Sequence, residues 1–254
     1  MKQVGFADHF SGIASSYARY RPRYPRALGE WLAARVSRRR RAWDCGTGNG
    51  QVAVMLAEHF EQVVATDASA QQLEQAVAYP SVDYVCATAE RSPLAASRFD
   101  LVAVGQALHW FDAPAFFAEA SRVVAPDGLV AVWCYGVLSV GPGVDALLHE
   151  LYYDVVGKYW PPKRALVDSG YAGVEFPFEE IEPPSLAIEQ IWSLPDLLGY
   201  VATWSATVRF RRETGQDPVD VIRSRLEPAW GSAASRREVR WPLFVRAGYP
   251  AARR

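Results

Sequence analysis

The sequence has few of the residues that build metal sites or disulfide frameworks. Its 254 residues include only three cysteines and four histidines. Cys45, Cys86 and Cys134 lie far apart, show no metal-ligand spacing and are odd in number, so we expect buried free thiols in a reducing compartment. The histidines form no metal-binding pattern with carboxylates. No metal site is therefore predicted.

Long apolar runs and a dominant charge are also missing. No apolar stretch approaches the ~18 residues of a membrane span, and the opening MKQVGFADHFSG lacks the apolar core of a signal peptide. The formal net charge of −1 gives no general attraction to nucleic acid or to an anionic membrane. We expect a soluble, cytoplasmic protein without nucleic-acid or membrane partners, and the oligomeric state stays open.

A run of four arginines, residues 38–41, is the feature that would suggest nucleic acid. It comes directly before the first expected strand, at the sheet edge opposite the ligand-binding loops. We interpret it as a solvated helix end, where cations complement the helix dipole.

Aromatic residues, by contrast, are abundant. The chain has nine tryptophans, twelve tyrosines and eleven phenylalanines, many of them in its second half. Such side chains suit a lid that closes over a small organic substrate. The alternative is that they pack accessory helices onto a sheet.

Short apolar runs alternate with helical patterns from residue 41 to 135. Strands are expected at residues 41–45, 62–66, 82–87, 99–105 and 128–135, and helices at 51–60, 70–78 and 114–124. This alternation predicts a parallel sheet covered by helices on both faces. Right-handed crossovers then place every loop that follows a strand at one edge, where ligands bind.

The remainder predicts a helix at residues 144–156, an acidic strand-like run at 174–182, a largely helical stretch at 186–230 and a closing strand at 237–246. The fold class is α/β, a Rossmann-like doubly wound, mostly parallel seven-stranded sheet with an antiparallel closing strand. We expect one domain over residues 1–254. It consists of an N-terminal lid segment (1–30), a cofactor-binding core (31–182), a helical lid insertion (183–235) and the closing strand (236–247).

A glycine-rich loop follows the first expected strand, in the order Asp44-Cys45-Gly46-Thr47-Gly48-Asn49-Gly50. Glycine permits positive φ and a close approach of the backbone to a ligand, and the helix that follows directs N–H groups towards it. Asp67 ends the second expected strand, where a ribose would be held in a βαβ nucleotide site. The pattern therefore predicts a nucleotide-like ligand.

The glycines alone fit two ligands. Counting a dinucleotide fingerprint from Gly48 puts Ala53 at its last position, which a looser form allows. That pattern leaves unexplained Asp44, which stands two residues before three alternate glycines. This arrangement resembles the first motif of class I S-adenosylmethionine-dependent methyltransferases.

Four further stretches extend the resemblance along nearly the whole chain, namely residues 17–25, 106–112, 122–128 and 203–205. Together they are similar to the small-molecule branch that includes trans-aconitate methyltransferase. The resemblance implies S-adenosylmethionine as methyl donor, with S-adenosylhomocysteine as product. It implies a small-molecule acceptor, O-methylated at a carboxylate or hydroxyl by direct SN2 transfer.

The same resemblance assigns roles to individual residues. Those expected to contact the cofactor are Tyr17, Arg21, Asp44, Gly46, Gly48, Gly50, Asp67, Ala68, Ala89, Glu90, Gln106 and Ala107. Asp67 would accept hydrogen bonds from both ribose hydroxyls, a role that suits a carboxylate. The residues expected around the acceptor are His109 as catalytic residue, with Trp110, Tyr24 and Trp204.

Several of these roles have alternatives. Arg21 would pair with the cofactor carboxylate, or it merely fixes an extended lead-in to the first helix. His109 would deprotonate a hydroxyl or orient a carboxylate, or it only caps the next helix or packs beneath the lid. Trp110 would form a pocket wall or contact the sulfonium cation.

Two other functions compete with this interpretation. A methyltransferase acting on RNA or protein would need a basic or open groove, whereas this chain is near neutral and is expected to be lidded. A non-catalytic cofactor-binding module is the other alternative.

Overall fold

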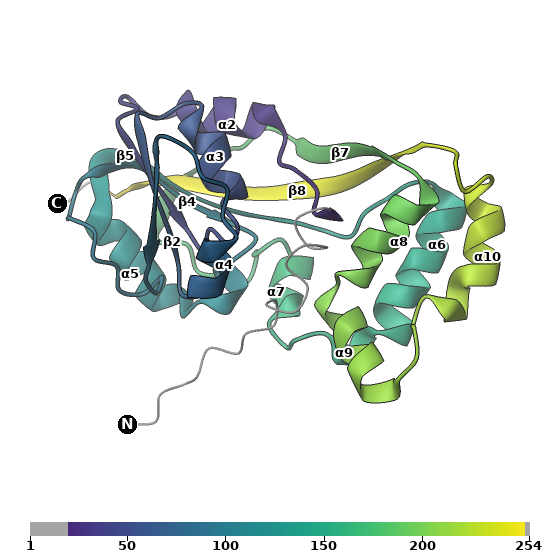
Figure 1. Cartoon of the computed structure of the whole chain (residues 1–254). Helices are drawn as coiled ribbons and strands as arrows, with labels where there is room; N and C mark the ends of the chain where they lie inside the picture. The colour runs from purple at the N-terminus through teal and green to yellow at the C-terminus, as the bar shows by residue number, and fades with distance from the viewer. Residues whose placement is uncertain (1–19, 252–254) are drawn as a thin grey trace.

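The structure, a computed structural model, describes residues 20–251. Its centre is an eight-stranded sheet with the order β3-β2-β1-β4-β5-β8-β6, and β7 pairs with β8 as well (Figure 1). The strands are β1 (Arg41–Cys45), β2 (Gln62–Asp67), β3 (Val82–Cys86), β4 (Phe99–Gly105), β5 (Val124–Tyr135), β6 (Phe178–Ile181), β7 (Leu186–Trp192) and β8 (Arg237–Pro250).

The first five strands are parallel, and helices cover both of their faces as expected. Neighbouring residues of a strand point to opposite faces, so each strand contributes to two cores. Ala42 and Leu101 pack with α2 (Arg26–Ala33) and α3 (Gln51–Ala57), whereas Trp43 and Val102 pack with α5 (Ala113–Val123). The Rossmann-like α/β fold predicted from the alternation is confirmed.

The antiparallel part of the sheet is larger than expected. β8 pairs with β5, β6 and β7, all antiparallel to it. The sheet has eight strands rather than seven because β7 lies in a stretch for which the sequence predicts helix. Its Ile188 is fully buried while Glu189 is exposed, the alternation of a strand. Segment 183–235 therefore begins with a strand, and only its later part is helical.

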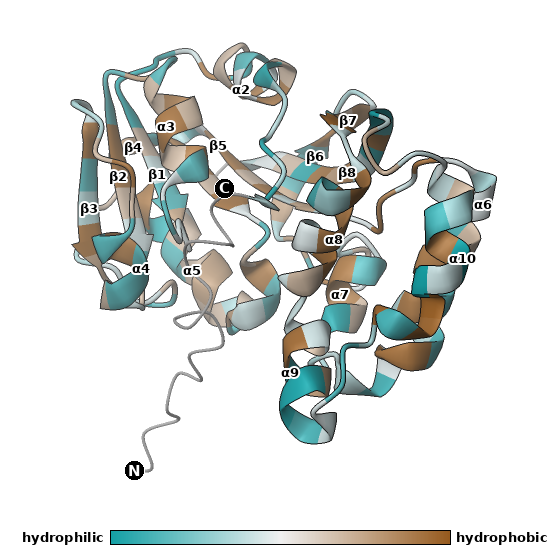
Figure 2. Ribbon diagram, turned by 45° about the vertical axis from the view of Figure 1, so that its right-hand side comes forward, coloured by the Kyte–Doolittle hydropathy of each residue, from teal (hydrophilic) through white to brown (hydrophobic). Residues whose placement is uncertain are grey.

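The helical block lies beside the sheet and is built from two separate parts of the chain (Figure 1). The segment between β5 and β6 supplies α6 (Pro142–His149), a π-helical turn (Glu150–Val155) and α7 (Arg164–Asp168). The segment between β7 and β8 supplies α8 (Leu194–Ala202), α9 (Ser205–Thr214) and α10 (Asp220–Trp230). Hydrophobic and hydrophilic residues both occur along α9 and α10 (Figure 2), as expected for helices that pack on one side.

Several boundaries differ from expectation. β5 begins at residue 124 rather than 128, because Val124 already pairs with Phe99 before a register shift. The helix expected at 70–78 is the shorter α4 (Ala70–Glu74). The helix expected at 144–156 changes from α to π geometry after residue 149.

The arginine run is not a helix end, because α2 ends at Ala33 and Arg41 already belongs to β1. Arg38 makes ion pairs with Asp127 at 2.5 Å and with Asp100 at 3.5 Å, at the edge where the strands begin. All three cysteines are free thiols, but only Cys45 and Cys134 are buried and Cys86 is exposed. Within residues 20–251, no helix combines the length and apolar character needed to cross a bilayer.

Trp241 on β8 joins the sheet to the helical block. It is fully buried, its indole N–H donates to the Tyr200 hydroxyl at 3.2 Å, and its ring lies 4.8 Å from that of Trp192. Trp241→Ala is expected to lower the free energy of unfolding by about 3–5 kcal/mol, measured by urea denaturation followed by circular dichroism.

The matched control for this substitution is Phe244→Ala, an aromatic truncation on the same strand whose side chain is 39% exposed. It should cost at most about half as much, because less apolar surface is lost from a buried position. If both variants lower the free energy of unfolding by the same amount, the contacts of Trp241 with Tyr200 and Trp192 have no special role in stability.

Candidate functional site

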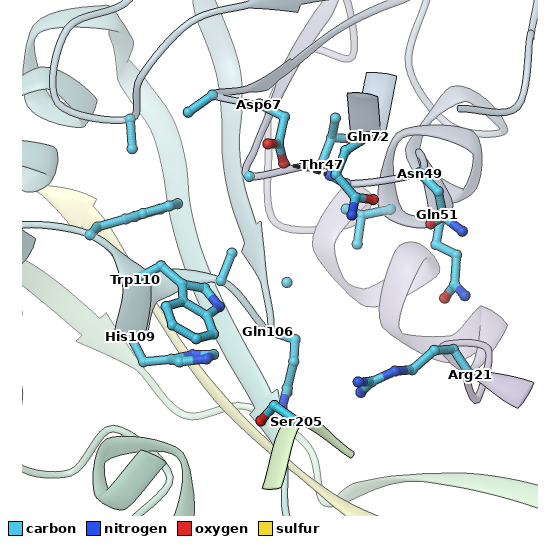
Figure 3. A pocket seen from close by; sticks show the side chains of 18 of the residues that line it. Arg21, Thr47, Asn49, Gln51, Asp67, Gln72, Gln106, His109, Trp110 and Ser205 are labelled. Carbon is cyan, nitrogen blue, oxygen red and sulfur yellow. Dashed lines mark hydrogen bonds between the residues drawn. The ribbon is translucent and has the colours of Figure 1, made fainter. Parts of the chain in front are cut away.

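A pocket of about 730 Å³ lies at the edge where β1, β2 and β4 end. Residues of the glycine loop and the end of β2 lie on one side, and His109, Trp110, Gln106 and Ser205 lie on another (Figure 3). The predicted site residues that line it are Arg21, Tyr24, Gly46, Gly48, Asp67, Ala68, Ala89, Glu90, Gln106, Ala107, His109, Trp110 and Trp204. Asp44 and Gly50 are not among its lining residues, and Tyr17 lies outside the described part of the chain.

The glycine loop needs its glycines for two physical reasons. Gly46, Gly48 and Gly50 all have positive φ, at 74°, 56° and 89°. A Cβ at Gly46 would lie 2.7 Å from the Cβ of Ala107, so the two loops approach too closely for a side chain. At Gly48 the nearest atom to such a Cβ is Gln72 Oε1 at 3.9 Å, an ordinary van der Waals distance, so only its positive φ requires glycine there. The loop is thus tightly packed against Ala107 at Gly46, while Gly48 lines the pocket.

Asp44 lies beneath the loop rather than in the pocket. It is fully buried, and the Thr47 hydroxyl donates a hydrogen bond of 2.5 Å to its Oδ2. Burial raises the pKa of Asp44 to about 7. Through Thr47, which does line the pocket, the carboxyl group holds the loop in place.

Asp67, at the end of β2, does line the pocket. Its Oδ2 accepts a hydrogen bond of 2.9 Å from the Gly48 N–H, and its Oδ1 accepts one of 2.9 Å from the Ser69 N–H. These bonds orient the carboxylate and link the loops that follow β1 and β2. Each oxygen keeps a further lone pair for a ligand hydroxyl. Burial raises the pKa of Asp67.

The next part of the wall is formed by small side chains. Ala68 and Ala89 both line the pocket and leave room for a flat group. Glu90 lies beside them, where its Oε1 accepts a hydrogen bond of 3.0 Å from the Asp112 N–H. Its carboxylate therefore also fixes the loop before α5.

His109 stands on a short 3₁₀ turn, Leu108–Trp110, that follows β4. Its Nδ1 lies 3.1 Å from the Tyr171 hydroxyl, and its ring is 4.7 Å from that of Trp110. Burial, with the nearby charges of Arg164, Lys163 and Arg21, lowers the pKa of His109 to about 3. The imidazole is therefore neutral at physiological pH and weakly basic.

Gln106 connects this turn to the sheet. Its φ of 56° is in the left-handed region, which a residue with a side chain seldom adopts. The side-chain Oε1 accepts a hydrogen bond of 2.8 Å from the Tyr135 N–H on the neighbouring strand. That bond stabilises the strained backbone conformation of Gln106 at the carboxyl end of β4.

The N-terminal residues that the structure describes reach the pocket. Arg21 Nη1 donates a hydrogen bond of 2.6 Å to the Tyr135 hydroxyl, and its guanidinium lies 6.0 Å from the centroid of the Tyr200 ring. The Tyr24 ring packs edge-on against Trp133 at 5.7 Å. Arg21 thus does more than lead into the first helix, since it lines the pocket itself.

Sequence reasoning assigned no role to several lining residues, among them Thr47, Tyr135, Arg164 and Ser205, and it considered Trp160 and Tyr200 only as part of the general aromatic content. Residues 160–162 were interpreted as a proline break, and α7, which carries Arg164, had no clear periodic pattern. No short-range signal could have shown that these two segments lie near the end of β4, because they reach it only through the packing of the helical block. Among the described residues, no cluster of three or more histidine, cysteine, aspartate or glutamate side chains could hold a metal ion.

The pocket suits an adenosine linked to a charged amino-acid chain. Its volume lies within the range of about 300–1,000 Å³ that organic ligands occupy. Its lining includes the oriented Asp67 carboxylate, which can accept hydrogen bonds from hydroxyls, small alanines beside which a flat ring fits, and the Arg21 guanidinium, which can donate to a carboxylate. The residues present therefore fit S-adenosylmethionine.

Comparison with known proteins gives a consistent result. A sequence model of the methyltransferase domain matches residues 43–132. A methyltransferase of Dictyostelium discoideum is 32% identical over 229 residues, covering 89% of this chain and 87% of that protein. The chain is also similar to a structure described as a type II methyltransferase from Anaeromyxobacter dehalogenans. That similarity has a TM-score of 0.86 and 44% identity, and covers 91% of this chain and 100% of the other.

A methyltransferase structure from Bacillus halodurans is more distant, at 21% identity and a TM-score of 0.52 over 89% of this chain and 99% of the other. At that distance it shows likeness of fold alone.

Substitution of Asp67 tests the carboxylate. Asp67→Asn turns one oxygen into an N–H₂ group that faces a backbone N–H and can no longer accept a hydrogen bond. The affinity for S-adenosylhomocysteine, measured by isothermal titration calorimetry, should fall about 10- to 100-fold. The control is Asp83→Asn on β3, an exposed carboxylate bonded to Gln62 outside the pocket. If both variants bind as tightly as the wild type, Asp67 has no role in the site.

Proposed function

The chain belongs to the class I S-adenosylmethionine-dependent methyltransferases, and from this premise we propose that it methylates an oxygen of a small organic molecule. One observation carries the proposal. The same pocket that holds the glycine loop and Asp67 continues into a part walled by aromatic residues and two arginines. A compact acceptor fits such a space, whereas the chain has no net positive charge to attract RNA.

We assign the cofactor contacts to the part of the pocket around the glycine loop. Asp67 would hold the ribose hydroxyls, Gly46 and Gly48 would let the backbone approach the amino-acid part, and Ala68 and Ala89 would flank the adenine. Arg21 would pair with the carboxylate of the cofactor, a contact that the planar guanidinium makes well. Asp44 and Gly50 would not touch the cofactor but would stabilise the conformation of the glycine loop. The role of Tyr17 stays a prediction.

When bound, S-adenosylmethionine would supply a methyl group on a positively charged sulfur, for transfer in a single SN2 step in which an acceptor oxygen bonds to the methyl carbon as the carbon–sulfur bond breaks. The protein's part is alignment of the acceptor and exclusion of water. Gln106, Ala107 and His109 lie where β4 ends, and we propose that they border the reacting atoms. Trp110 would serve as a wall for the acceptor.

We propose that the oxygen that accepts the methyl group belongs to a carboxylate. A hydroxyl must lose its proton during transfer, and His109, with its pKa lowered to about 3, is too weak a base for efficient removal. A carboxylate is already ionised at neutral pH and needs only to be positioned. His109 would then orient the acceptor through a hydrogen bond.

Two segments would close over the acceptor. Trp204 and Ser205 come from the helical part of segment 183–235, and Arg21 and Tyr24 come from the N-terminal segment, yet all four line one pocket. We propose that these segments form the lid, and we place the chain in the small-molecule branch that includes trans-aconitate methyltransferase on the motifs quoted above. Three free thiols support a reducing, cytoplasmic location.

Methyl transfer can be tested directly. The protein is incubated with S-adenosylmethionine labelled in its methyl group and with a panel of carboxylic acids, phenols and alcohols. The products are separated by liquid chromatography with mass detection. Label in a methyl ester is the expected result, and label only in protein or RNA added to the same reaction would contradict the proposal.

His109 makes a separate prediction about pH. Because its pKa lies near 3, the imidazole is neutral throughout pH 5–8, and kcat/KM should show no ionisation near pH 6.5. His109→Asn should lower kcat/KM about tenfold through loss of a hydrogen bond. Loss of a general base would cost about 10²- to 10⁴-fold.

The control for His109 is His149→Asn on α6, an exposed histidine outside the pocket, which should leave kcat/KM unchanged. An inflection near pH 6.5 that disappears in His109→Asn would show that His109 acts as a base instead.

A further inference from the structure

Arg164 brings a positive charge to the pocket that the roles assigned above do not use. It lies on α7, lines the pocket and has a side chain that is only 18% exposed. α7 contacts the turn that carries His109, and Arg164 is the nearby charge with the largest effect on the pKa of that histidine. Arg164 therefore stands on the side of the pocket where the acceptor is expected.

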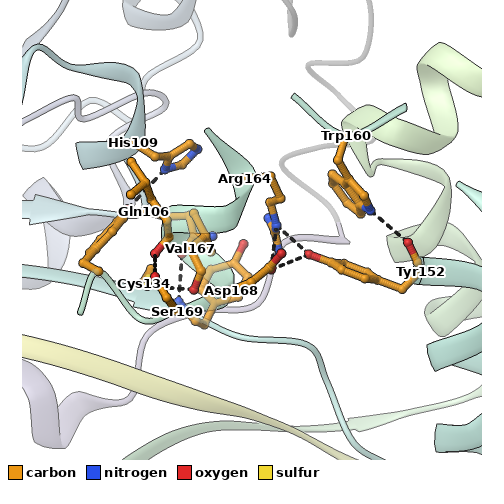
Figure 4. A network of polar contacts seen from close by, with 12 residues as sticks. Gln106, His109, Cys134, Tyr152, Trp160, Arg164, Val167, Asp168 and Ser169 are labelled. Atoms are coloured by element: carbon orange, nitrogen blue, oxygen red, sulfur yellow. Dashed lines mark hydrogen bonds and ion pairs between the residues drawn. The ribbon is translucent and has the colours of Figure 1, made fainter. Parts of the chain in front are cut away.

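The guanidinium of Arg164 is held in one orientation by its surroundings. Its Nε donates a hydrogen bond of 2.6 Å to the Tyr152 hydroxyl and lies 3.3 Å from Asp168 Oδ1. The same hydroxyl donates to Asp168 Oδ1 at 2.6 Å, which closes a triangle of polar contacts (Figure 4). The guanidinium also lies 4.7 Å from the Trp160 ring centroid. Such stacking is typical of an arginine fixed for recognition.

The contacts leave the outer edge of the guanidinium available. Every hydrogen bond that Arg164 makes to the described residues uses Nε, so Nη1 and Nη2 have no partner among residues 20–251. Neither nitrogen is sealed from solvent. Two parallel N–H groups on a rigid plane match the two oxygens of a carboxylate.

The distribution of charge favours an anion at this position. Arg164, Lys163 and Arg21 all act to lower the pKa of His109, so that histidine lies in a field of positive charge. Arg21 lies on the same side as Gln51 at the start of α3 (Figure 3), where it is placed to meet the carboxylate of the cofactor. The cofactor has one carboxylate, which Arg21 would bind, so the guanidinium of Arg164 is left for another ligand.

We propose that Arg164 is the specificity-determining residue of this site and binds a carboxylate of the acceptor through Nη1 and Nη2. This inference rests on the proposed function, since it concerns the acceptor part of the same pocket. Asp168 and Tyr152 are positioning residues that keep the guanidinium flat against Trp160. The acceptor is then a small carboxylic acid whose flat or unsaturated body packs on Trp160 and Trp204.

Pairs of ligands that differ only in charge test the proposal. Benzoate and trans-cinnamate are titrated into the protein saturated with S-adenosylhomocysteine, and so are the neutral benzamide and trans-cinnamamide. The measured quantity is the ratio of amide to carboxylate dissociation constants, obtained by ligand-observed NMR or calorimetry. The wild type should prefer the carboxylates by about tenfold or more.

Arg164→Gln should abolish this preference and leave amide binding unchanged, whereas general damage to the pocket would weaken both ligands of a pair. The control is Arg223→Gln on α10, an exposed arginine paired with Asp220 outside the pocket, which should keep the wild-type ratio. If Arg164→Gln does not fold, Arg164→Lys replaces it, with an expected loss of about threefold in the ratio because the charge stays but the paired N–H groups are lost.

The outcomes separate the two proposals. Failure of the wild type to bind S-adenosylhomocysteine contradicts the proposed function itself. Binding of S-adenosylhomocysteine without a carboxylate preference, or with a preference that survives substitution of Arg164, overturns only the role of Arg164.

Discussion

The parallel pairing of β1 with β2 and β4 is the constraint on which the site depends. Parallel strands end at the same edge of a sheet, so the loops after Cys45, Asp67 and Gly105 must meet there. The hydrogen bond from the Gly48 N–H to Asp67 ties two of these loops together. The third packs so closely that Gly46 has no room for a side chain beside Ala107. The arrangement of these three loops is therefore decided by the register of the sheet.

The long strand β8 is the second constraint on the site, because it connects the sheet with the helical block. One of its ends pairs with β5 and β6, and the other pairs with β7, so the strand extends from the parallel core towards the helical block. Both parts of that block are thereby held close to the end of β4. The aromatic residues divide accordingly, with Trp133, Trp230 and Trp241 fully buried in the interior and Trp110, Trp160 and Trp204 lining the pocket. Packing in the interior thus accounts for some of the aromatic residues, while others line the pocket.

The part of the pocket lined by the glycine loop and Asp67 could be predicted from sequence because these residues lie within a few positions of strand ends. Gly46, Gly48 and Asp67 belong to one local strand-loop-helix-strand pattern, and periodicity placed β1 and β4 at their observed bounds. On the other side of the pocket, His109, Trp110 and Trp204 were also predicted, but Arg164 was not, because it reaches the pocket only through long-range packing of the helical block. β7 was missed for a related reason, since its strand conformation is stabilised by pairing with a part of β8 about fifty residues later in the sequence. Asp44 was placed in the pocket because sequence spacing cannot distinguish a residue beneath a loop from one that faces the ligand.

The central claim is that one pocket has a cofactor half organised by Asp67 and an acceptor half organised by His109 and Arg164. A crystal structure of the chain with S-adenosylhomocysteine tests it most directly. The account predicts ribose hydroxyls on the Asp67 carboxylate, adenine beside Ala68 and Ala89, and the sulfur atom directed towards the space between Gln106 and Arg164. A ligand whose amino-acid carboxylate occupies the Arg164 guanidinium, or whose ribose lies away from Asp67, would contradict it.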